Sequence, residues 1–586
     1  METGMLQLAS NKKSAYTIVI RKEHTPSEQY AAEELQKYFL KSTGAELKIA
    51  TDDTAVSEKE IAVGFTNRAA EDTALAEELG DEGYVLKTDG NKLLILGSGV
   101  RGALYGVYTF LEKYLGCRFY TFNFEKIPTH ETLEIPEMNI KDIPAFEYRD
   151  VYWFSVDGED IKAKLKINGS LENNLTARVG GGVFYTGGFC HTIGHLAEMP
   201  CGSDGLVWDQ PCFSDEKVYQ TVLKNVKKII EENPDTKIIS ISQNDGNSGE
   251  CSCEKCRAVF EEEHSHMGTM LRFVNRIQEE IKKDYPGVHI DTLAYRFSRH
   301  APDVTVPHED VIIRLCNIEA CFRHPLNDCN SPDWGGQGQF SKDLEKWSKI
   351  CNHLYIWDYT TNFTNFSTAF ANFEVLRPNV RFFVDNGVKG VFEQGNIAAL
   401  NGEFGELRGY LLAKLLWNPR MSEEEYQTLM NEFIADYYGE AGKYVRAYLD
   451  LMHDCSKESH FGVYFDDSSK YIYVPGYDDP LEGAFEFIRR GNELWDKAEA
   501  AAKNDFELAN VQRSRIQLYN YIYFVLRKQS DRVPESEKAA IEEKIIANNK
   551  KQFELMKKYE VWYNREFHSI ENVENPDFSR AALCWE

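Results

Sequence analysis

Between residues 147 and 420, segments with the pattern of buried strands alternate with segments that have the apolar spacing of amphipathic helices. The clearest strands are predicted at 236–242, 289–295, 311–316, 353–357 and 390–393. Helices are predicted between them at 216–232, 268–284, 341–351 and 373–387. Alternation over about 270 residues is typical of parallel βαβ units that close into an eight-stranded barrel. The alternative, a doubly wound open sheet, would need a glycine-rich phosphate-binding turn after its first strand, and the sequence has none there. We therefore predict a (β/α)8 TIM-type barrel over 147–420.

The segments on either side of this alternation have different patterns. Residues 8–140 contain short β-branched runs and an amphipathic helix at 27–40, which predict a small α/β domain. Residues 127–147 contain three prolines and little periodicity, which is typical of a linker. From 421 to 586 the pattern becomes helical. The predicted fold class is therefore α/β, with a small N-terminal α/β domain, a central barrel and a helical C-terminal region.

The charge and the apolar pattern exclude several classes of partner. The chain of 586 residues has 66 basic and 93 acidic side chains, a formal charge of −27, which would repel a nucleic acid. No apolar run reaches the length of about 18 residues that a membrane span requires. The first residues lack the basic and apolar build of a signal peptide, so we expect a cytoplasmic protein, or a secreted one whose leader is absent from this chain. The sequence leaves the oligomeric state open.

Acidic residues follow four of the predicted strands, where the active site of a barrel lies. These candidate catalytic residues are Asp245, Glu319, Asp358 and Glu393. Hydrolysis of a glycosidic bond needs an acid for the leaving oxygen and a second group that stabilises or attacks the anomeric carbon. The alternative is that such acids cap the following helices. We predict that the four carboxylates line one site.

Several segments resemble known carbohydrate-active proteins. The stretch GSGVRGALYGVYTFLEKYLGCRFYTF (97–122) resembles the end of the small domain that precedes the barrel in family 20 β-hexosaminidases and family 67 α-glucuronidases. The stretches 242–256, 314–326, 354–363 and 387–396 resemble the domain of unknown function 4838. Part of that group is classified as glycoside hydrolase family 163, which acts on N-glycans as an endo-β-N-acetylglucosaminidase. The resemblance implies a glycoside hydrolase for N-acetylglucosamine-containing glycans, with an oligosaccharide as its partner.

The resemblance also implies roles for Asn244 and Asp245. Family 20 enzymes have an Asp-Glu pair at this position, in which the Asp polarises the acetamido group of the substrate and the Glu is the acid. This chain has Asn-Asp instead. Asp245 is therefore expected either to protonate the leaving group or to orient the acetamido group, and Asn244 to hold a sugar substituent. A substrate-assisted mechanism, in which the acetamido oxygen attacks, is the leading hypothesis.

Two other functions remain open from the sequence. An α-glucuronidase-like hydrolase would need basic groups for the uronate, and four arginines are available: Arg149, Arg296, Arg314 and Arg323. A barrel that binds glycans without cleaving them is the third hypothesis. The separation of the two carboxyl groups would distinguish a retaining from an inverting enzyme.

Aromatic and histidine side chains near the predicted strand ends are candidate substrate-binding residues. Sugar rings stack on aromatic faces, and core packing is the alternative for each of these: Tyr152, Trp153, Tyr295, Trp357 and Tyr359. His191 and His195 have the i, i+4 spacing of a helical metal site, but a metalloprotease would need Glu where Thr192 stands. We interpret the two histidines as substrate-binding loop residues.

Three cysteines, Cys251, Cys253 and Cys256, directly follow the predicted Asp245 loop in the order C-x-C-x-x-C. They resemble part of a zinc knuckle, with His264, His266 or another cysteine as a fourth ligand. Because no second C-x-x-C completes a usual four-cysteine site, we predict a local disulfide or buried thiols. No metal and no cofactor are predicted.

Overall fold

The structure is a computed structural model, and it describes residues 4–69, 73–171, 174–202, 207–246, 249–331, 333–334 and 338–570. The chain divides into two compact units. The first contains Met1–Arg149 and Val156–Val183, and the second contains Asp150–Ser155 and Phe184–Glu586.

The first unit is built on a six-stranded sheet with the order β10-β5-β6-β4-β2-β3. The bounds of these strands are Thr17–Ile20 (β2), Lys48–Thr51 (β3), Glu60–Val63 (β4), Tyr84–Asp89 (β5), Lys92–Gly97 (β6) and Asn139–Asp142 (β10). Two further ribbons pair Met5–Ser10 (β1) with Thr132–Pro136 (β9), and Arg118–Thr121 (β7) with Phe124–Lys126 (β8). Because β9 and β10 both lie within 127–147, the linker predicted there is wrong. That stretch adds an edge strand to the sheet and pairs with β1.

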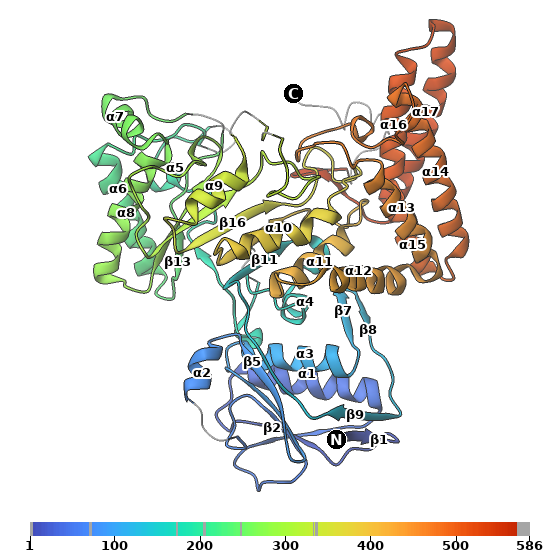
Figure 1. The fold of residues 1–586 in the computed structure, drawn as a ribbon. Helices are drawn as coiled ribbons and strands as arrows, with labels where there is room; N and C mark the ends of the chain where they lie inside the picture. The colour runs from blue at the N-terminus through green and yellow to red at the C-terminus, as the bar shows by residue number, and fades with distance from the viewer. Residues whose placement is uncertain are drawn as a thin grey trace. The chain divides into compact units, whose positions relative to one another are not determined.

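Two long helices, Pro26–Thr43 (α1) and Gly102–Tyr114 (α3), lie side by side on this sheet (Figure 1). Thr25 and Glu28 form a capping box at the start of α1, and Gly44, with φ 69°, ends it. A Cβ atom on Gly106 would lie 2.7 Å from Ile95 Cγ2, so only glycine allows α3 to pack this closely on β6. The unit also contains Thr73–Leu79 (α2) and Glu159–Lys164 (α4).

The second unit contains a seven-stranded sheet with the order β11-β17-β16-β15-β14-β13-β12. Its strands are Tyr148–Tyr152 (β11), Tyr185–Thr186 (β12), Ile238–Ser240 (β13), His289–Ala294 (β14), Val311–Cys316 (β15), Leu354–Tyr359 (β16) and Gly390–Gln394 (β17). From β12 to β17 every neighbouring pair is parallel. This half-barrel with its helices confirms the predicted fold class.

The described sheet has seven strands in place of the eight predicted. The segment around Asn168, in the first unit, forms only isolated pairings. Arg149 O accepts hydrogen bonds from the backbone N–H groups of Asn168 and Gly169, and Val183 N donates to Asn168 O. The Asn168 side chain donates hydrogen bonds to Glu82 and to Glu147 O.

Helices follow the strands of the half-barrel as the alternation predicts. They are Ile193–Leu196 (α5), Glu216–Glu232 (α6), Glu254–Glu263 (α7), Met267–Asp284 (α8), Phe340–Trp347 (α9), Phe373–Asp385 (α10) and Gly405–Trp417 (α11). The apolar positions of α6, among them Val222 and Val226, are buried, as its amphipathic pattern requires. The predicted bounds of α6 and α8 are correct to within one residue, whereas α9 ends four residues before its predicted end at 351.

The C-terminal region is helical, as predicted, and packs around its own aromatic core. Its helices are Glu423–Tyr438 (α12), Gly442–Asp454 (α13), Pro480–Ala501 (α14), Asp505–Ser514 (α15), Ile516–Ser530 (α16) and Glu535–Lys558 (α17). Trp495 of α14 lies against Tyr448 of α13, with ring centroids 4.9 Å apart. A short hairpin, Tyr563–Arg565 (β18) and His568–Ser569 (β19), follows α17 and was not predicted.

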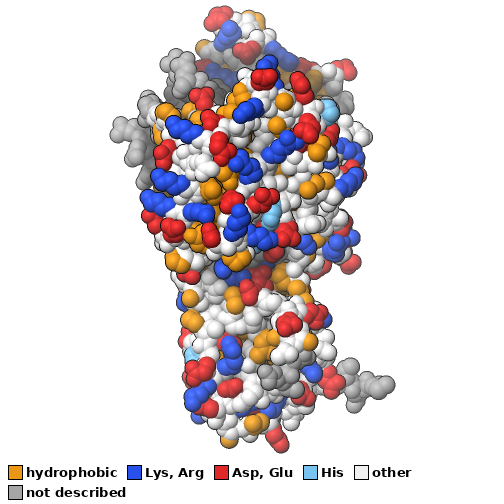
Figure 2. All heavy atoms as spheres, turned by 90° about the vertical axis from the view of Figure 1, so that its left-hand side faces the viewer, with side chains coloured by type: hydrophobic (Ala, Val, Ile, Leu, Met, Phe, Trp, Pro, Cys, Tyr) orange, Lys and Arg blue, Asp and Glu red, His pale blue; other side chains and the backbone are white. Residues whose placement is uncertain are grey.

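Two general expectations concern the surface and the membrane. On the face shown in Figure 2, acidic and basic side chains are interspersed, so that face presents no block of positive charge to a nucleic acid. Among the helices of the described residues, none combines the length and the apolar character that crossing a bilayer requires.

Candidate active site

Asp245 lies in the loop that follows β13, at the carboxyl end of the half-barrel sheet. Its Oδ1 atom accepts hydrogen bonds from Tyr295 Oη at 3.2 Å and from the Gly246 backbone N–H at 2.8 Å. Tyr295 Oη in turn accepts a hydrogen bond from Arg296 Nε at 2.7 Å. A chain of hydrogen bonds therefore runs from a guanidinium through a phenol to the carboxylate, all from residues that follow strands β13 and β14.

Two residues beside Asp245 have a strained backbone. Arg296 and His191 have φ values of 51° and 53°, in the left-handed region that residues with a Cβ atom rarely adopt. The His191 ring lies 6.0 Å from the Tyr295 ring, and its Nδ1 is 2.8 Å from Gln243 O. Backbone strain of this kind clusters at functional sites, where surrounding contacts hold it in place. The substrate-binding role of His191 stays a prediction.

Asn244 has a different place from the one predicted. Its side chain is buried, Oδ1 accepts from Gly194 N at 3.0 Å, and Nδ2 donates to Asp209 O at 2.7 Å. Both ends of the amide are thus engaged by backbone groups, one in α5 and one in the loop before α6. Asn244 fixes the loop that carries Asp245 and does not hold a sugar substituent directly.

Two residues from the C-terminal region, Tyr464 and Glu566, interact with Asp245 electrostatically. Burial raises the pKa of the Glu566 carboxyl, and the negative charge of Asp245 raises it further. Glu566 Oε1 accepts a hydrogen bond from Gln394 Nε2 at 2.7 Å, and Gln394 Oε1 accepts one from Trp357 Nε1 at 2.8 Å. The terminal hairpin is therefore linked to the strand ends of β16 and β17.

We call Asp245, Tyr295, Arg296, Tyr464 and Glu566 the Asp245 cluster. Sequence reasoning missed Glu566, Tyr464 and Gln394. Glu566 lies in the turn of the β18–β19 hairpin, and its partner Gln394 is 172 positions earlier. No local pattern in the sequence marks a residue that reaches the site from so far along the chain.

Glu319, after β15, is buried and ion-paired. Its Oε2 atom lies 3.2 Å from Arg299 Nη1, and the same guanidinium contacts Asp333 at 2.9 Å and Asp343 at 2.7 Å. Burial raises the pKa of Glu319 in spite of Arg299, and raises the pKa of Asp333 to about 6. Glu319 also interacts electrostatically with Arg296 and Tyr464, which places it beside the Asp245 cluster.

Asp358 and Glu393 form a separate pair. They are register partners on β16 and β17. Successive side chains of a strand point to opposite faces, so both carboxyls lie on the face opposite to Trp357 and Gln394, which hydrogen-bond to each other. Because Gln394 is the residue that contacts Glu566, the structure does not bring all four acids together, and the predicted single site is wrong on this point. Sequence reasoning placed Asp358 and Glu393 after their strands, whereas both lie inside β16 and β17, and the sequence could not fix the register that decides the face.

Burial raises the pKa of Asp358 to about 6, and burial together with the Asp358 carboxyl raises the pKa of Glu393 well above its usual range. A group whose pKa is higher in the folded than in the unfolded state stabilises the fold fully below its unfolded pKa, and loses that contribution as the pH rises through the folded pKa. Glu393→Gln cannot ionise, so its free energy of unfolding relative to wild type should rise between pH 5 and pH 8.

One pKa unit corresponds to about 1.4 kcal/mol, so we expect a relative gain of at least about that size in urea unfolding at the two pH values. A difference that does not change with pH would contradict the pairing. If Glu393→Gln lowered kcat as much as an Asp245 variant does, Glu393 would have to be assigned to the active site.

The predicted substrate-binding residues fall into two sets. Tyr295, Trp357 and Tyr359 lie at the carboxyl ends of their strands, with the rings of Trp357 and Tyr359 stacked at 6.1 Å. Trp153 is buried, its ring would overlap any Cβ on Gly395, and its Nε1 donates to Thr360 Oγ1. It is therefore a core residue and not a stacking platform for a sugar.

Two further residues predicted to bind substrate are Arg149 and His195. Arg149 lies on β11, whose first two residues fall in the first unit, and it is buried with its Nη1 atom 2.7 Å from Glu82 Oε2. An arginine held in this way is not a substrate-binding residue of the half-barrel. His195 lies in α5 and is exposed to solvent. Its substrate-binding role stays a prediction.

Two family models match successive parts of the chain. The family model described as "Domain of unknown function (DUF4838)" matches residues 119–450. The model described as "Glycosyl hydrolase family 67 N-terminus" matches residues 6–110. Both families were expected from the sequence motifs, and the resemblance is confirmed.

Two individual proteins are similar over different lengths. A protein named beta-hexosaminidase from Porphyromonas gingivalis is 36% identical over 107 residues, which are 18% of this chain and 13% of that protein. The structure of a family 89 glycoside hydrolase from Clostridium perfringens in complex with PUGNAc superimposes with a TM-score of 0.50 at 11% identity. That superposition covers 89% of this chain and 65% of the other, and it shows a shared fold.

Proposed function

Since the chain belongs to the family described as domain of unknown function DUF4838, whose model matches residues 119–450, we propose that it is a glycoside hydrolase acting on N-acetylglucosamine-containing glycans. The N-terminal match to the family 67 glycosyl hydrolases and the relative named beta-hexosaminidase support this class of reaction. Each of these matches covers only part of the chain, so the proposal depends on the chemistry of the site.

The observation that carries the proposal is the hydrogen-bonded Asp245, beside a second carboxyl whose pKa is raised. Enzymes that cleave glycosides need one group that bears charge and another that holds a proton at the working pH. Asp245 Oδ1 is used as an acceptor by Tyr295 and Gly246. Glu566 holds its proton more strongly than an ordinary carboxyl, because of burial and of Asp245 itself.

The different environments of Asp245 and Glu566 suggest different roles in catalysis. Asp245 accepts a hydrogen bond from the N–H of a 2-acetamido group, which directs the acetamido oxygen toward the anomeric carbon and stabilises the positive charge that develops when it attacks. Glu566 supplies the proton to the leaving oxygen, and Glu319 is the second candidate for that role because its pKa is also raised. Tyr295 and Arg296 hold Asp245 in position.

The α-glucuronidase alternative has little support among the four arginines considered for it. Arg149 pairs with Glu82 in the first unit, Arg314 pairs with Asp291, and Arg323 pairs with Glu374. The remaining arginine, Arg296, donates to Tyr295 Oη. A uronate carboxylate would therefore have to compete with hydrogen bonds and ion pairs already present.

The proposed function is tested with aryl β-N-acylglucosaminides whose N-acetyl group carries no, one, two or three fluorine atoms. Fluorine withdraws electrons from the amide oxygen, so kcat should fall with each fluorine if that oxygen is the nucleophile. Equal rates across the series would exclude substrate assistance but not hydrolysis. An aryl glucuronide serves as the control for the alternative, and turnover of that substrate alone would replace the proposal. Binding of an N-glycan with no turnover of any substrate would identify a non-catalytic barrel.

A further inference from the structure

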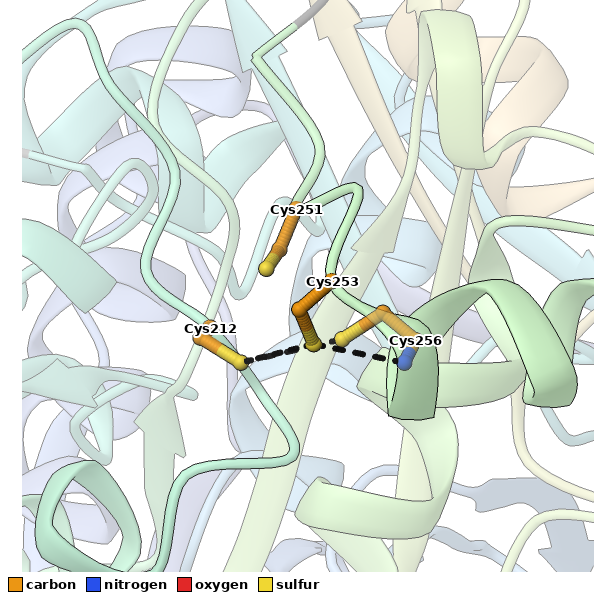
Figure 3. Close-up of side chains that lie close together, drawn as sticks. All are labelled: Cys212, Cys251, Cys253 and Cys256. Carbon is orange, nitrogen blue, oxygen red and sulfur yellow. Dashed lines mark hydrogen bonds between the residues drawn. The ribbon is translucent and has the colours of Figure 1, made fainter.

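Four cysteines of the second unit lie around one point. Cys212, from the loop before α6, joins Cys251, Cys253 and Cys256, and all four sulfur atoms lie within 4.8 Å of one another (Figure 3). Cys212 Sγ is 3.7 Å from Cys253 Sγ and 3.7 Å from Cys256 Sγ. All twelve described cysteines are free, so the described residues contain no disulfide of the kind that the sequence allowed here.

The spacing of the sulfur atoms matches a tetrahedral metal site. Four thiolates at about 2.3 Å from a zinc ion would lie about 3.8 Å from one another. A disulfide would need an S–S distance of about 2.05 Å, and unrelated thiols would have no reason to converge from two separate loops. The fourth ligand of the C-x-C-x-x-C motif is Cys212. It lies 41 positions before Cys253 and is not part of a second C-x-x-C, so the sequence pattern did not indicate it.

A second cluster consists of Cys321, His324, Cys329 and His460. His460 Nδ1 lies 3.6 Å from the sulfur atoms of both Cys321 and Cys329, and His324 Nδ1 lies 3.6 Å from Cys321 Sγ. For a tetrahedral zinc ion with Zn–S of about 2.3 Å and Zn–N of about 2.05 Å, the sulfur and nitrogen atoms would be about 3.6 Å apart. Three separate distances therefore agree with one geometry.

The second cluster has the outer hydrogen bond that metal-binding histidines usually make. His324 Nε2 lies 2.8 Å from Lys457 O, so that nitrogen carries the proton and Nδ1 is left with its lone pair toward the two sulfur atoms. This contact is independent of the three ligand distances. It fixes both the orientation and the tautomer that coordination through Nδ1 requires.

From these two geometries we propose that the protein binds two structural zinc ions, one at the four-cysteine cluster and one at the Cys321–His324–Cys329–His460 cluster. Each set supplies four protein ligands, so neither ion keeps an open position for substrate or water. The first ion joins the loop before α6 to the start of α7. The second joins the segment after β15 to the segment after α13.

The second site has a structural consequence for the Asp245 cluster. Cys321 follows Glu319 by two positions, and His460 precedes Tyr464 by four. Phe322 N donates to Phe461 O at 2.9 Å, so the two segments already run together at this point. A zinc ion here would restrain the two segments that carry Glu319 and Tyr464, without taking part in the reaction.

The proposal is tested by measuring the metal content of the full-length protein, purified without chelator, by inductively coupled plasma mass spectrometry. We expect about two zinc ions per chain. Cys253→Ser should remove one, Cys329→Ser should remove the other, and the double variant should contain none. Cys201→Ser, an exposed cysteine outside both clusters, is the matched control and should keep both.

A variant that fails to fold is distinguished by exchanging one ligand type for another. His460→Cys and Cys253→His keep a zinc ligand at the same position, so both should retain two ions, whereas His460→Ala should retain one. A wild-type protein that is folded and free of zinc would overturn the proposal. So would stoichiometric iron in place of zinc, or a zinc content that the ligand variants leave unchanged. None of these outcomes depends on the proposed glycosidase activity.

Discussion

Asp245→Asn is expected to lower kcat by about 10²–10³-fold with little change in substrate affinity, because the interaction it removes stabilises charge that exists only in the transition state. The Asn side chain has nearly the same shape and still accepts a hydrogen bond from Tyr295 through its Oδ1. What it loses is the negative charge that stabilises the attacking acetamido group. The measurement is kcat and KM on aryl β-N-acetylglucosaminides. An unchanged kcat on every substrate would remove Asp245 from catalysis.

The dependence of the rate on the leaving group distinguishes the roles of Asp245 and Glu566. An acidic phenol leaves without protonation, so a variant without the acid should be slow mainly with poor leaving groups, by about 10²–10⁴-fold. Glu566→Gln should show this dependence, and Asp245→Asn should lose rate equally with good and poor leaving groups. The reverse pattern would make Asp245 the acid, which is the other role that the sequence allowed. Asp454→Asn, at the exposed end of α13, is the matched control and should behave as wild type.

Arg299→Met is expected to destabilise the second unit by about 3–5 kcal/mol, which is the usual cost of leaving a buried charge without its partner. Arg299 has no exposed side-chain surface and is the shared cation of Glu319, Asp333 and Asp343. Methionine fills much of the same volume but leaves three carboxylates without that positive charge. Urea unfolding at pH 7 measures the loss. Arg381→Met, which breaks a half-exposed ion pair with Asp385, should cost less than about 1 kcal/mol.

The loss in free energy of unfolding caused by Arg299→Met should become smaller as the pH falls. The pKa of Asp333 is raised from 3.8 to about 6 by burial even with Arg299 present, and the pKa of Glu319 is raised as well. Groups with raised pKa values contribute their full stability below the unfolded pKa and lose it as the pH rises through the folded pKa. Without the arginine these pKa values should rise further, so the variant should be weakest relative to wild type above pH 6 and closest to it near pH 4. A deficit independent of pH would contradict the electrostatic explanation.

The repeating elements of the barrel could be predicted because each one is determined locally. Val311–Cys316 is a run of buried residues with matching bounds, and Glu216–Glu232 has a regular apolar face and an Asp215 cap. The strands β9 and β10 could not be predicted, since they are short, lie next to prolines and depend on partners far along the chain.

The candidate site was predictable only in part, for a related reason. Strand ends identify residues such as Asp245, but a shift of one position moves a side chain to the other face of the sheet, as it does for Glu393 beside Gln394. Residues held by long-range contacts, such as Glu566 and Cys212, have no local signal at all. The sequence therefore identified buried carboxylates near the strand ends, but it did not show which of them belong to the same site.

The position of Glu566 has a consequence for how the protein is made. A ribosome synthesises the half-barrel and its Asp245 loop well before the hairpin at Tyr563–Ser569, and the hydrogen bond between Gln394 and Glu566 joins residues 172 positions apart. Until the hairpin has been made, the chain therefore lacks the residue that we propose as the proton donor. We therefore expect a chain that ends before Tyr563 to lack the proposed hydrolase activity.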